Sequence, residues 1–390
     1  ESGRAVPAPL PILMTRYLHI VSFDIPYPAN YGGAIDVFYR IRALHESGVR
    51  VILHCYYKGA LHHEHALESL CHQVFYYPRR TTLWQNFSTL PYAVMSRPTE
   101  PLLTHLLQDD YPILFEGLVC CQLLTHPALR TRARFFRECN IEHDYYRALG
   151  KASPSLWKKI FFSIEARKLQ RYERQHLLTV NAVFALAHHD EVHFAQMFPT
   201  VPVVYIPCFH PEDTPECPSD RGNYILYHGN LSVAENHKAA VHIITRIAPR
   251  LPDLPFVIAG LHPSKQLQTL AALQPNIRLV DSPSEQEMQT LIADAQIHLL
   301  MTFQGTGLKL KLLHVLYRGR HVVVNPDMVV GTELGQLCHI GQTDADIVRL
   351  CRECFERPFT RSDMDERAAL LAELFNNKQL VNTLIQHIYP

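Results

Sequence analysis

The sequence predicts an α/β protein made of two domains, each built around a parallel sheet. Short apolar segments alternate with longer amphipathic ones along both halves of the 390-residue chain, which is typical of βαβ units. A chain of this length exceeds what one hydrophobic core usually organises. The proline-rich stretch 207–218 separates the two series and has the composition of a linker. We therefore expect two α/β units that face each other across a cleft.

The first domain is expected over residues 15–206. It begins with a strand at 16–23, a loop ending in Gly32-Gly33, a helix over 34–47 that Gly48 ends, and a strand at 50–56. Later segments indicate a helix over 102–108 and strands at 73–77, 113–115, 134–137, 182–186 and 203–206. Between 145 and 176 the sequence mixes aromatic and basic residues. Such a helix could pack on its own sheet, or it could lie on a membrane surface or hold an anionic lipid-linked acceptor.

The second domain is expected over residues 207–375. Its strands are predicted at 224–227, 256–259, 277–280, 297–301 and 322–325, with helices between them. The chain after residue 361 has a helical pattern. We expect its last part, residues 376–390, to pack back on the first domain.

The segment after the predicted strand 297–301 has the pattern of a phosphate site. Thr306 and Gly307 belong to a glycine-containing turn, and Lys309 and Lys311 fall at the start of the following amphipathic helix. Glycine lets the backbone approach an anion, and a helix N-terminus favours negative charge. A bound diphosphate would neutralise both lysines, whereas the alternative is a simple turn followed by solvated charges.

The composition excludes several classes of function. The 37 basic and 37 acidic residues balance, so a nucleic-acid partner bound through bulk charge is not expected. No segment is long and apolar enough to span a bilayer and none resembles a secretory signal, which predicts a cytoplasmic protein. Metal binding could be considered at Cys351-x-x-Cys354 or at His62-His63-x-His65, but a buried helix and a solvated loop explain these residues better.

Four further motifs occur in a characteristic order along the chain. They are Tyr31-Gly32-Gly33-Ala34, Arg137-Glu138-Cys139-Asn140-Ile141-Glu142-His143, His228-Gly229-Asn230-Leu231-Ser232 and Gly331-Thr332-Glu333. From Tyr17 onward the chain resembles a glycosyltransferase of the GT-B fold, which has two Rossmann-like domains. It is most similar to family 4 of these enzymes, which are retaining and metal-independent, and to a branch with an Arg-x-His-Asn-hydrophobic-Glu motif.

The resemblance implies a donor site for a nucleotide sugar in the cleft. The residues that would form it are Gly32, Gly33, His228, Gly229, Asn230, Thr306, Gly307, Lys309, Lys311, His314 and Glu333. The chain departs from the family pattern at several of these positions. Asn230 and Glu235 stand where the wider family has two cations, and Thr306 and His314 replace a pair of glutamates. We expect the two lysines to supply the missing cations, and His314 either to bond a ribose hydroxyl or to pack between helices.

Catalytic candidates follow two strands of the first domain. Glu116 follows one strand, and Asn140, Glu142 and His143 follow another, so their side chains are expected to project towards the cleft. Glu116 or Glu142 could accept the acceptor's proton, or either could be a structural carboxylate. Cys139 stands where the branch has histidine. The resemblance implies retention at the anomeric carbon, with the leaving phosphate as a further proton acceptor.

The expected function is transfer of a hexosyl or N-acetylhexosaminyl group from a UDP- or GDP-linked sugar. The acceptor would be a hydroxyl of a glycan, a lipid-linked or a protein-linked molecule in cell-surface polysaccharide or lipopolysaccharide biosynthesis, with peripheral contact at the inner face of the membrane. No cofactor and no metal are expected. The alternatives are a catalytically degenerate GT-B partner or scaffold protein and, less favoured, a nucleotide-sugar epimerase. A dehydrogenase is disfavoured because no Gly-x-Gly-x-x-Gly follows either opening strand.

Overall fold

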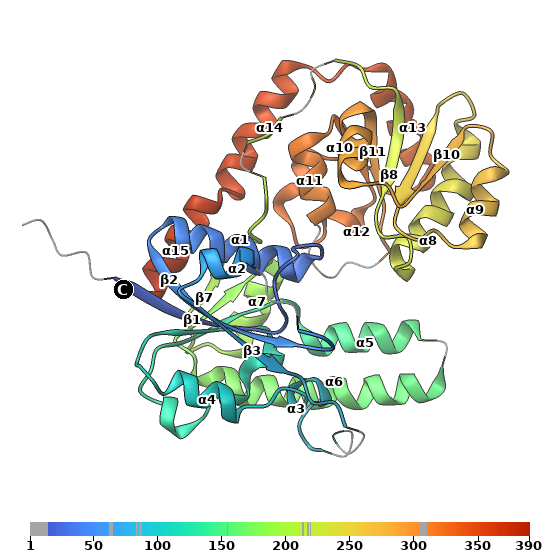
Figure 1. Ribbon diagram of the computed structural model, residues 1–390. Helices are drawn as coiled ribbons and strands as arrows, with labels where there is room; N and C mark the ends of the chain where they lie inside the picture. Colours follow the sequence, from blue (N-terminus) through green and yellow to red (C-terminus); the bar gives the residue numbers. More distant parts are fainter. Residues whose placement is uncertain are drawn as a thin grey trace, which may run out of the picture.

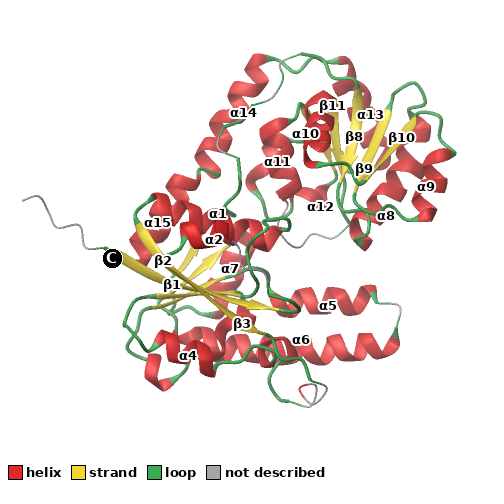
Figure 2. Cartoon of the chain, viewed as in Figure 1, coloured by secondary structure: helices red, strands yellow, loops and turns green. Residues whose placement is uncertain are grey.

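The computed structural model describes residues 15–61, 65–82, 85, 88–153, 155–212, 214–216, 218, 220–303 and 310–390. Two α/β domains lie one above the other (Figure 1), and each has a parallel sheet between helices (Figure 2). This is the α/β architecture that the alternating pattern predicts.

The N-terminal sheet has seven parallel strands in the order β3-β2-β1-β4-β5-β6-β7. Its central strands are buried on both faces, which explains their nearly continuous apolar sequences. The strands are β1 (Arg16–Ser22), β2 (Val49–Tyr57), β3 (Gln73–Pro78), β4 (Ile113–Glu116), β5 (Arg134–Arg137), β6 (Ala182–Ala185) and β7 (Val203–Tyr205).

Two regions of this domain differ from the sequence prediction in a way that matters for the site. The helix α1 already begins at Gly32, so the glycine pair lies in its first turn rather than in a loop. The aromatic and basic stretch forms two helices, α5 and α6, which pack side by side (Figure 1). The helices are α1 (Gly32–Glu46), α2 (His65–Leu70), α3 (Tyr92–Met95), α4 (Glu100–Leu106), α5 (Glu142–Ala152), α6 (Leu156–His176) and α7 (His188–Met197).

The C-terminal sheet has six parallel strands in the order β10-β9-β8-β11-β12-β13. The strands are β8 (Tyr224–His228), β9 (Phe256–Gly260), β10 (Ile277–Asp281), β11 (Ala295–Leu300), β12 (His321–Val324) and β13 (His339–Ile340). The edge strand β13 was not expected, since its two residues carry no periodic signal. In both sheets the strand order reverses once, between β1 and β4 and between β8 and β11. Ligands of open α/β sheets bind outside such reversals, at the carboxyl ends of the strands.

The last two helices connect the domains. They follow the helices of the second domain, α8 (Ala234–His242), α9 (Lys265–Ala272), α10 (Glu285–Asp294), α11 (Leu310–Arg318), α12 (Pro326–Val329) and α13 (Asp344–Glu356). From there α14 (Arg361–Leu374) runs back towards the first domain, and α15 (Asn377–Ile388) packs against α1 (Figure 1). Val381 and Leu384 of α15 join the N-terminal core, and the Tyr389 hydroxyl donates to Tyr17 O at 2.6 Å. Among the described helices, none combines the length and the apolar character needed to cross a bilayer.

Candidate active site between the domains

A cavity of about 300 Å³ lies between the two domains, at the carboxyl ends of β5, β6 and β7. Its N-terminal wall is formed by the loops after β5 and β6, and its C-terminal wall by α11 and the segment after α12. The lining residues are Cys139, Asn140, Ile141, Asp144, Tyr145, Leu186, Ala187, His189, Asp190, Tyr205, Pro207, Cys208, Leu313, Val330, Gly331, Thr332, Leu334 and Phe375. Of the predicted catalytic residues, Asn140 lines this cavity.

His228 ends β8 and places an unpartnered nitrogen at the reversal in the C-terminal sheet. The residue is 7% exposed, and its Nε2 has no hydrogen-bond partner among the described residues. Burial, together with the neighbouring His314 and Lys311, lowers the pKa of His228 to about 3. The imidazole is therefore neutral at physiological pH and can donate one N–H to an anionic ligand without carrying a charge.

Lys311 lies beside His228 and is held by the helix that follows β8. Its Nζ donates to Asn236 Oδ1 at 2.9 Å and lies 5.3 Å from the centre of the Tyr227 ring. Asn236 Nδ2 in turn donates to Asn230 O at 3.0 Å. The ammonium is thus half-buried and oriented at the carboxyl edge of the sheet. The other predicted residues of this phosphate site, Thr306, Gly307 and Lys309, lie outside the described residues.

The turn after β8 is shaped by close backbone approach. A Cβ atom on Gly229 would lie 3.2 Å from Asn236 Cγ, and one on Gly260 would lie 1.7 Å from Gly229 O. Asn230 directs its Oδ1 to Ser232, accepting from the backbone N at 3.1 Å and from Oγ at 2.6 Å. Its side chain therefore stabilises the turn. Glu235 accepts a hydrogen bond from the Thr302 hydroxyl, so Asn230 and Glu235, which stand where the wider family has cations, both have partners within the protein.

His314 pairs with a carboxylate from the interdomain linker. Its Nδ1 lies 2.6 Å from Glu212 Oε1, and Arg318 Nε donates to Glu212 Oε2 at 2.6 Å. Burial opposes ionisation of Glu212, but its bonds to His314 and Arg318 outweigh burial and lower its pKa. Because Nδ1 is used by Glu212, a ribose hydroxyl could contact His314 only through Nε2. The histidine thus connects α11 to the linker, which favours the packing role of the two alternatives considered for it.

Glu333 forms a contact between the domains. It begins the short helix Glu333–Leu337, and its Oε1 lies 2.8 Å from Nε2 of His188, the first residue of α7. The other ring nitrogen, Nδ1, lies 2.8 Å from Glu191 Oε2. Burial opposes protonation of His188, but the two carboxylates outweigh burial and raise its pKa. This contact holds the two walls of the cavity together.

Gly32 and Gly33 bring the first turn of α1 close to the end of β1. A Cβ atom on Gly33 would lie 2.7 Å from Phe23 Cζ, so a larger residue would displace that ring. Both residues are partly exposed. Their backbone N–H groups belong to the unpaired donors that begin every helix, which makes them available to an anion.

Glu116 does not project into the cleft as expected. It is completely buried, and its Oε1 lies 2.5 Å from Arg40 Nη2. Burial raises the pKa of Glu116 to about 7, although Arg40 opposes that shift. Asp36 and Arg137 complete this buried group, and Arg137 donates to Ile206 O at 2.5 Å and to Pro207 O at 3.0 Å. The group therefore anchors the start of the linker, and its geometry favours a structural role for Glu116.

Three residues after β5 lie in different surroundings. Asn140 faces the cavity, Glu142 is half-buried at the start of α5, and His143 is 2% exposed and points away from the cleft towards Glu173. Burial raises the pKa of Glu142 to about 7, and Arg97 opposes the shift. A carboxylate with such a pKa is suited to accept a proton near neutral pH. Cys139 lines the cavity where the resembling branch has histidine, and burial raises the pKa of its thiol.

Sequence reasoning did not identify Arg97, Glu212 or His188. Arg97 is buried, donates to Phe23 O at 3.1 Å, and acts electrostatically on Glu142. Each of these residues belongs to a segment without a recognisable motif and reaches the site through tertiary packing. His188 did carry one signal, because it follows the predicted strand 182–186 at its carboxyl end.

Comparison with known proteins gives a family match in the C-terminal half of the chain. Residues 222–344 match the family model of glycosyl transferases group 1. A Klebsiella pneumoniae protein described as an uncharacterized 44.6 kDa protein in the cps region is 27% identical over 331 residues, which cover 81% of this chain and 82% of that protein.

Two solved structures share the whole architecture. Sucrose-phosphate synthase from Thermosynechococcus elongatus superposes with a TM-score of 0.66 at 12% identity, covering 95% of this chain and 98% of the other. A structure described as trehalose-6-phosphate from E. coli bound with UDP-2-fluoro glucose gives 0.62 at 9% identity, covering 95% and 98%. The chain thus has the two-domain GT-B fold of glycosyltransferases, and its second domain matches group 1 of these enzymes.

Proposed function

We propose that this protein is a glycosyltransferase that takes a sugar from a nucleotide diphosphate sugar in the cleft between its domains. The observation that carries the proposal is the buried Nε2 of His228, which has no partner among the described residues, beside the oriented ammonium of Lys311 at the reversal of the C-terminal sheet. This edge belongs to the domain that matches the group 1 model. The similarity to a structure bound with UDP-2-fluoro glucose supports UDP as the first nucleotide to test.

The donor diphosphate would be stabilised by protein groups in place of a metal ion. In the proposed complex Lys311 pairs with a phosphate oxygen, neutral His228 donates an N–H, and the amides at the start of α1 face the same anion. The bond between the anomeric carbon and the phosphate oxygen breaks, and the acceptor oxygen bonds to that carbon. The acceptor's proton passes to the departing phosphate or to Glu142, which its raised pKa of about 7 suits to the task.

The N-terminal wall would hold the acceptor. Asn140 and Tyr145 line the cavity on this side, and Asn140 can orient a hydroxyl through its amide. Closure of the two walls through His188 and Glu333 would exclude water that otherwise hydrolyses the donor. The similarity to a protein from a cps region supports an acceptor in polysaccharide assembly.

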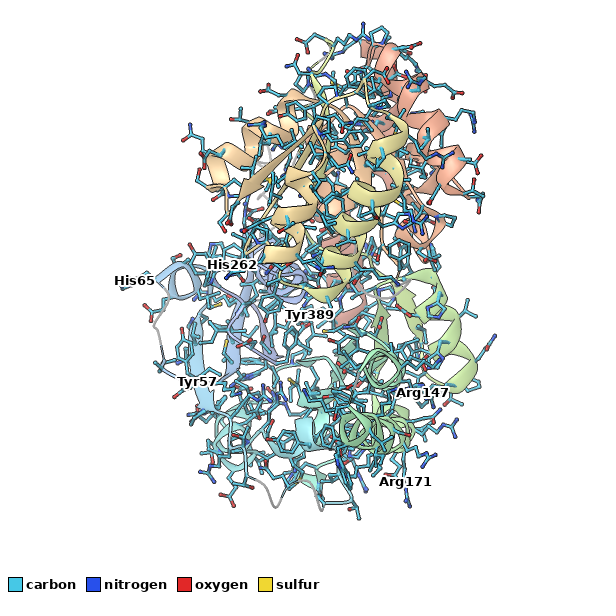
Figure 3. The ribbon with its side chains drawn as sticks, turned by 90° about the vertical axis from the view of Figure 1, so that its right-hand side faces the viewer. Tyr57, His65, Arg147, Arg171, His262 and Tyr389 are labelled. Atoms are coloured by element: carbon cyan, nitrogen blue, oxygen red, sulfur yellow. The ribbon has the colours of Figure 1, made fainter. Side chains whose placement is uncertain are left out.

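The helix α6 presents a surface suited to an anionic membrane. Leu156 and Trp157 are 70% and 81% exposed, Ile160 and Ile164 follow on the same side, and Lys158 and Lys159 lie among them. Arg147 and Arg171 extend from this hairpin of α5 and α6 (Figure 3). Exposed apolar side chains with basic neighbours bind the interface of anionic lipids. We propose that this face brings a lipid-linked acceptor to the cleft.

The donor proposal is tested by calorimetry of the purified protein with UDP, GDP and their sugars, with and without EDTA. Saturable binding of one nucleotide class that EDTA leaves unchanged, followed by release of that nucleoside diphosphate when an acceptor is added, is the expected result. Binding without turnover on any acceptor would favour the non-catalytic partner. That alternative draws support from Glu235, whose carboxylate replaces a cation of the family. Conversion of the nucleotide sugar into its epimer would identify an epimerase.

The membrane contact needs a separate test. Sedimentation with vesicles of anionic phospholipid should retain the protein, and the Trp157→Ser variant should lose most of the bound fraction. Leu273→Ser is the matched control, because Leu273 is also 70% exposed but lies on the C-terminal domain. Equal loss in both variants would contradict a specific role of α6.

A further inference from the structure

Three metal-ligand side chains from three different helices meet inside the N-terminal domain. His143 lies in the first turn of α5, Glu173 near the end of α6 and His193 in α7. His143 Nδ1 lies 3.6 Å from Glu173 Oε1, and His193 Nε2 lies 3.8 Å from the same oxygen. One ligand atom from each residue lies within 4.8 Å of the other two. The cluster is separate from the proposed donor site, which belongs to the other domain.

None of the three inward-facing atoms makes a hydrogen bond within 3.5 Å to a described residue, although both imidazoles face the Glu173 carboxylate as ion-pair partners. His143 and Glu173 are each 2% exposed, and His143 Nδ1, Glu173 Oε1 and His193 Nε2 are inaccessible and without hydrogen-bond partners among the described residues. Leaving one buried polar atom unpaired costs about 1–3 kcal/mol. Three such unpaired atoms around one point therefore indicate that a ligand is bound there, which a single unpaired atom would not.

The spacing of these atoms fits a shared cation better than direct hydrogen bonds. A charge-assisted N–H···O bond places its heavy atoms about 2.7–2.9 Å apart. Ligands about 2.0–2.1 Å from a tetrahedral zinc ion lie about 3.4 Å from one another. The observed separations of 3.6 and 3.8 Å are closer to the second arrangement.

We propose that His143, Glu173 and His193 bind one Zn²⁺ ion. Two imidazoles and one carboxylate are ligands that zinc accepts, and the fourth position would hold water. His193 is 25% exposed, so the cluster lies near the surface of the domain although the ligand atom Nε2 is buried. On the far side of the His143 ring, Asp144 Oδ1 lies 3.8 Å from Nε2.

The ion would stabilise the wall of the cavity. It would join the start of α5 to α6 and α7, and α5 follows directly after Cys139, Asn140 and Ile141, which line the cavity. Zinc would thus stabilise the N-terminal wall, which is proposed to hold the acceptor. The donor diphosphate would bind in the other domain without the ion. The sequence pattern hides this site because His143, Glu173 and His193 are far apart in the chain.

The test uses the full chain, stripped with EDTA and titrated with Co²⁺ and Zn²⁺. We expect one ion per chain, visible Co²⁺ absorption without a thiolate charge-transfer band, and a higher melting temperature with Zn²⁺. The His193→Gln variant should weaken binding by more than the roughly 10- to 100-fold that loss of an outer partner costs. His193→Gln is chosen because this residue is partly exposed and its replacement should leave the fold intact.

The matched control is His339→Gln. The only other described cluster of this kind comprises His321, His339 and Cys354, and binding there would produce a thiolate band that depends on His339. Absence of stoichiometric binding, a thiolate band, or equal affinity in His193→Gln and the native chain would overturn the proposal. UDP calorimetry on the EDTA-treated protein reports separately on the donor site, so failure of either proposal is recognisable by itself.

Discussion

Replacing Lys311 with alanine should weaken binding of a nucleoside diphosphate without unfolding the protein. Lys311 is half-buried, and its ammonium is already oriented by Asn236 at 2.9 Å and by the Tyr227 ring at 5.3 Å. A hydrogen bond to a charged group contributes about 1.5–3 kcal/mol. The dissociation constant for UDP should therefore increase roughly 10- to 150-fold.

The same variant should lose little stability in the absence of ligand. The hydrogen bond to Asn236 and the contact with Tyr227 together contribute about 1–2 kcal/mol, which a melting curve can measure. Lys378→Ala removes the same charge from an exposed position on α15 and should leave UDP affinity unchanged. Equal UDP affinity of Lys311→Ala and the native chain in calorimetry, or an equal loss in Lys378→Ala, would contradict a contact between Lys311 and the diphosphate.

Three further predictions address the N-terminal domain and the contact between the walls. Because Glu142 is a carboxylate only above its pKa of about 7, kcat/KM should rise with pH up to about that value and then become constant. The Glu142→Gln variant should lose this pH-dependent rise, and its kcat should fall by about 10²- to 10⁴-fold. The Glu116→Gln variant changes a residue whose partner is Arg40 in the buried group, so it should keep the rise of kcat/KM with pH. Loss of that rise in Glu116→Gln would contradict the role of Glu142 as the proton acceptor. Because the pKa of His188 is raised, its ion pair with Glu333 should be fully formed below the ordinary histidine pKa of 6.5 and should weaken as pH rises through the folded-state pKa. Small-angle scattering should then detect a wider cleft at high pH. The His188→Gln variant should show no such pH dependence. Arg137→Ala should cost about 3–5 kcal/mol in urea unfolding because it leaves Asp36 buried with one cation fewer, whereas the exposed Arg147→Ala should cost no more than about 0.5 kcal/mol; similar costs for both would show that the buried group does not anchor the linker.

The sequence was sufficient to predict the α/β architecture and the helix that contains Lys311, whereas phosphate binding by that helix stays a prediction. Alternating apolar and amphipathic segments report directly on buried parallel strands and their helices. The helix containing Lys311 was recognisable from its amphipathic spacing, and the cations at its start, which oppose the helix dipole, suggested an anionic ligand. The break between α5 and α6 was also readable in principle, since Ser153-Pro154-Ser155 disfavours a continuous helix, but the aromatic pattern concealed it.

The orientation of individual side chains could not be predicted from the sequence. Glu116 follows a strand towards the cleft, yet its side chain turns inwards because Arg40 on α1 offers a buried partner. His143 belongs to a recognised motif, yet it faces Glu173 and His193 because α6 and α7 pack beside it. Such outcomes depend on contacts between distant segments, which local periodicity does not encode.

The most direct test of the proposed donor site is a crystal structure of the protein soaked with UDP. Difference density for the diphosphate is expected at the carboxyl ends of β8 and β11, within hydrogen-bond distance of Lys311 Nζ and His228 Nε2. Density for UDP at any other place on the chain, or none at concentrations that saturate binding in calorimetry, would contradict the proposed site.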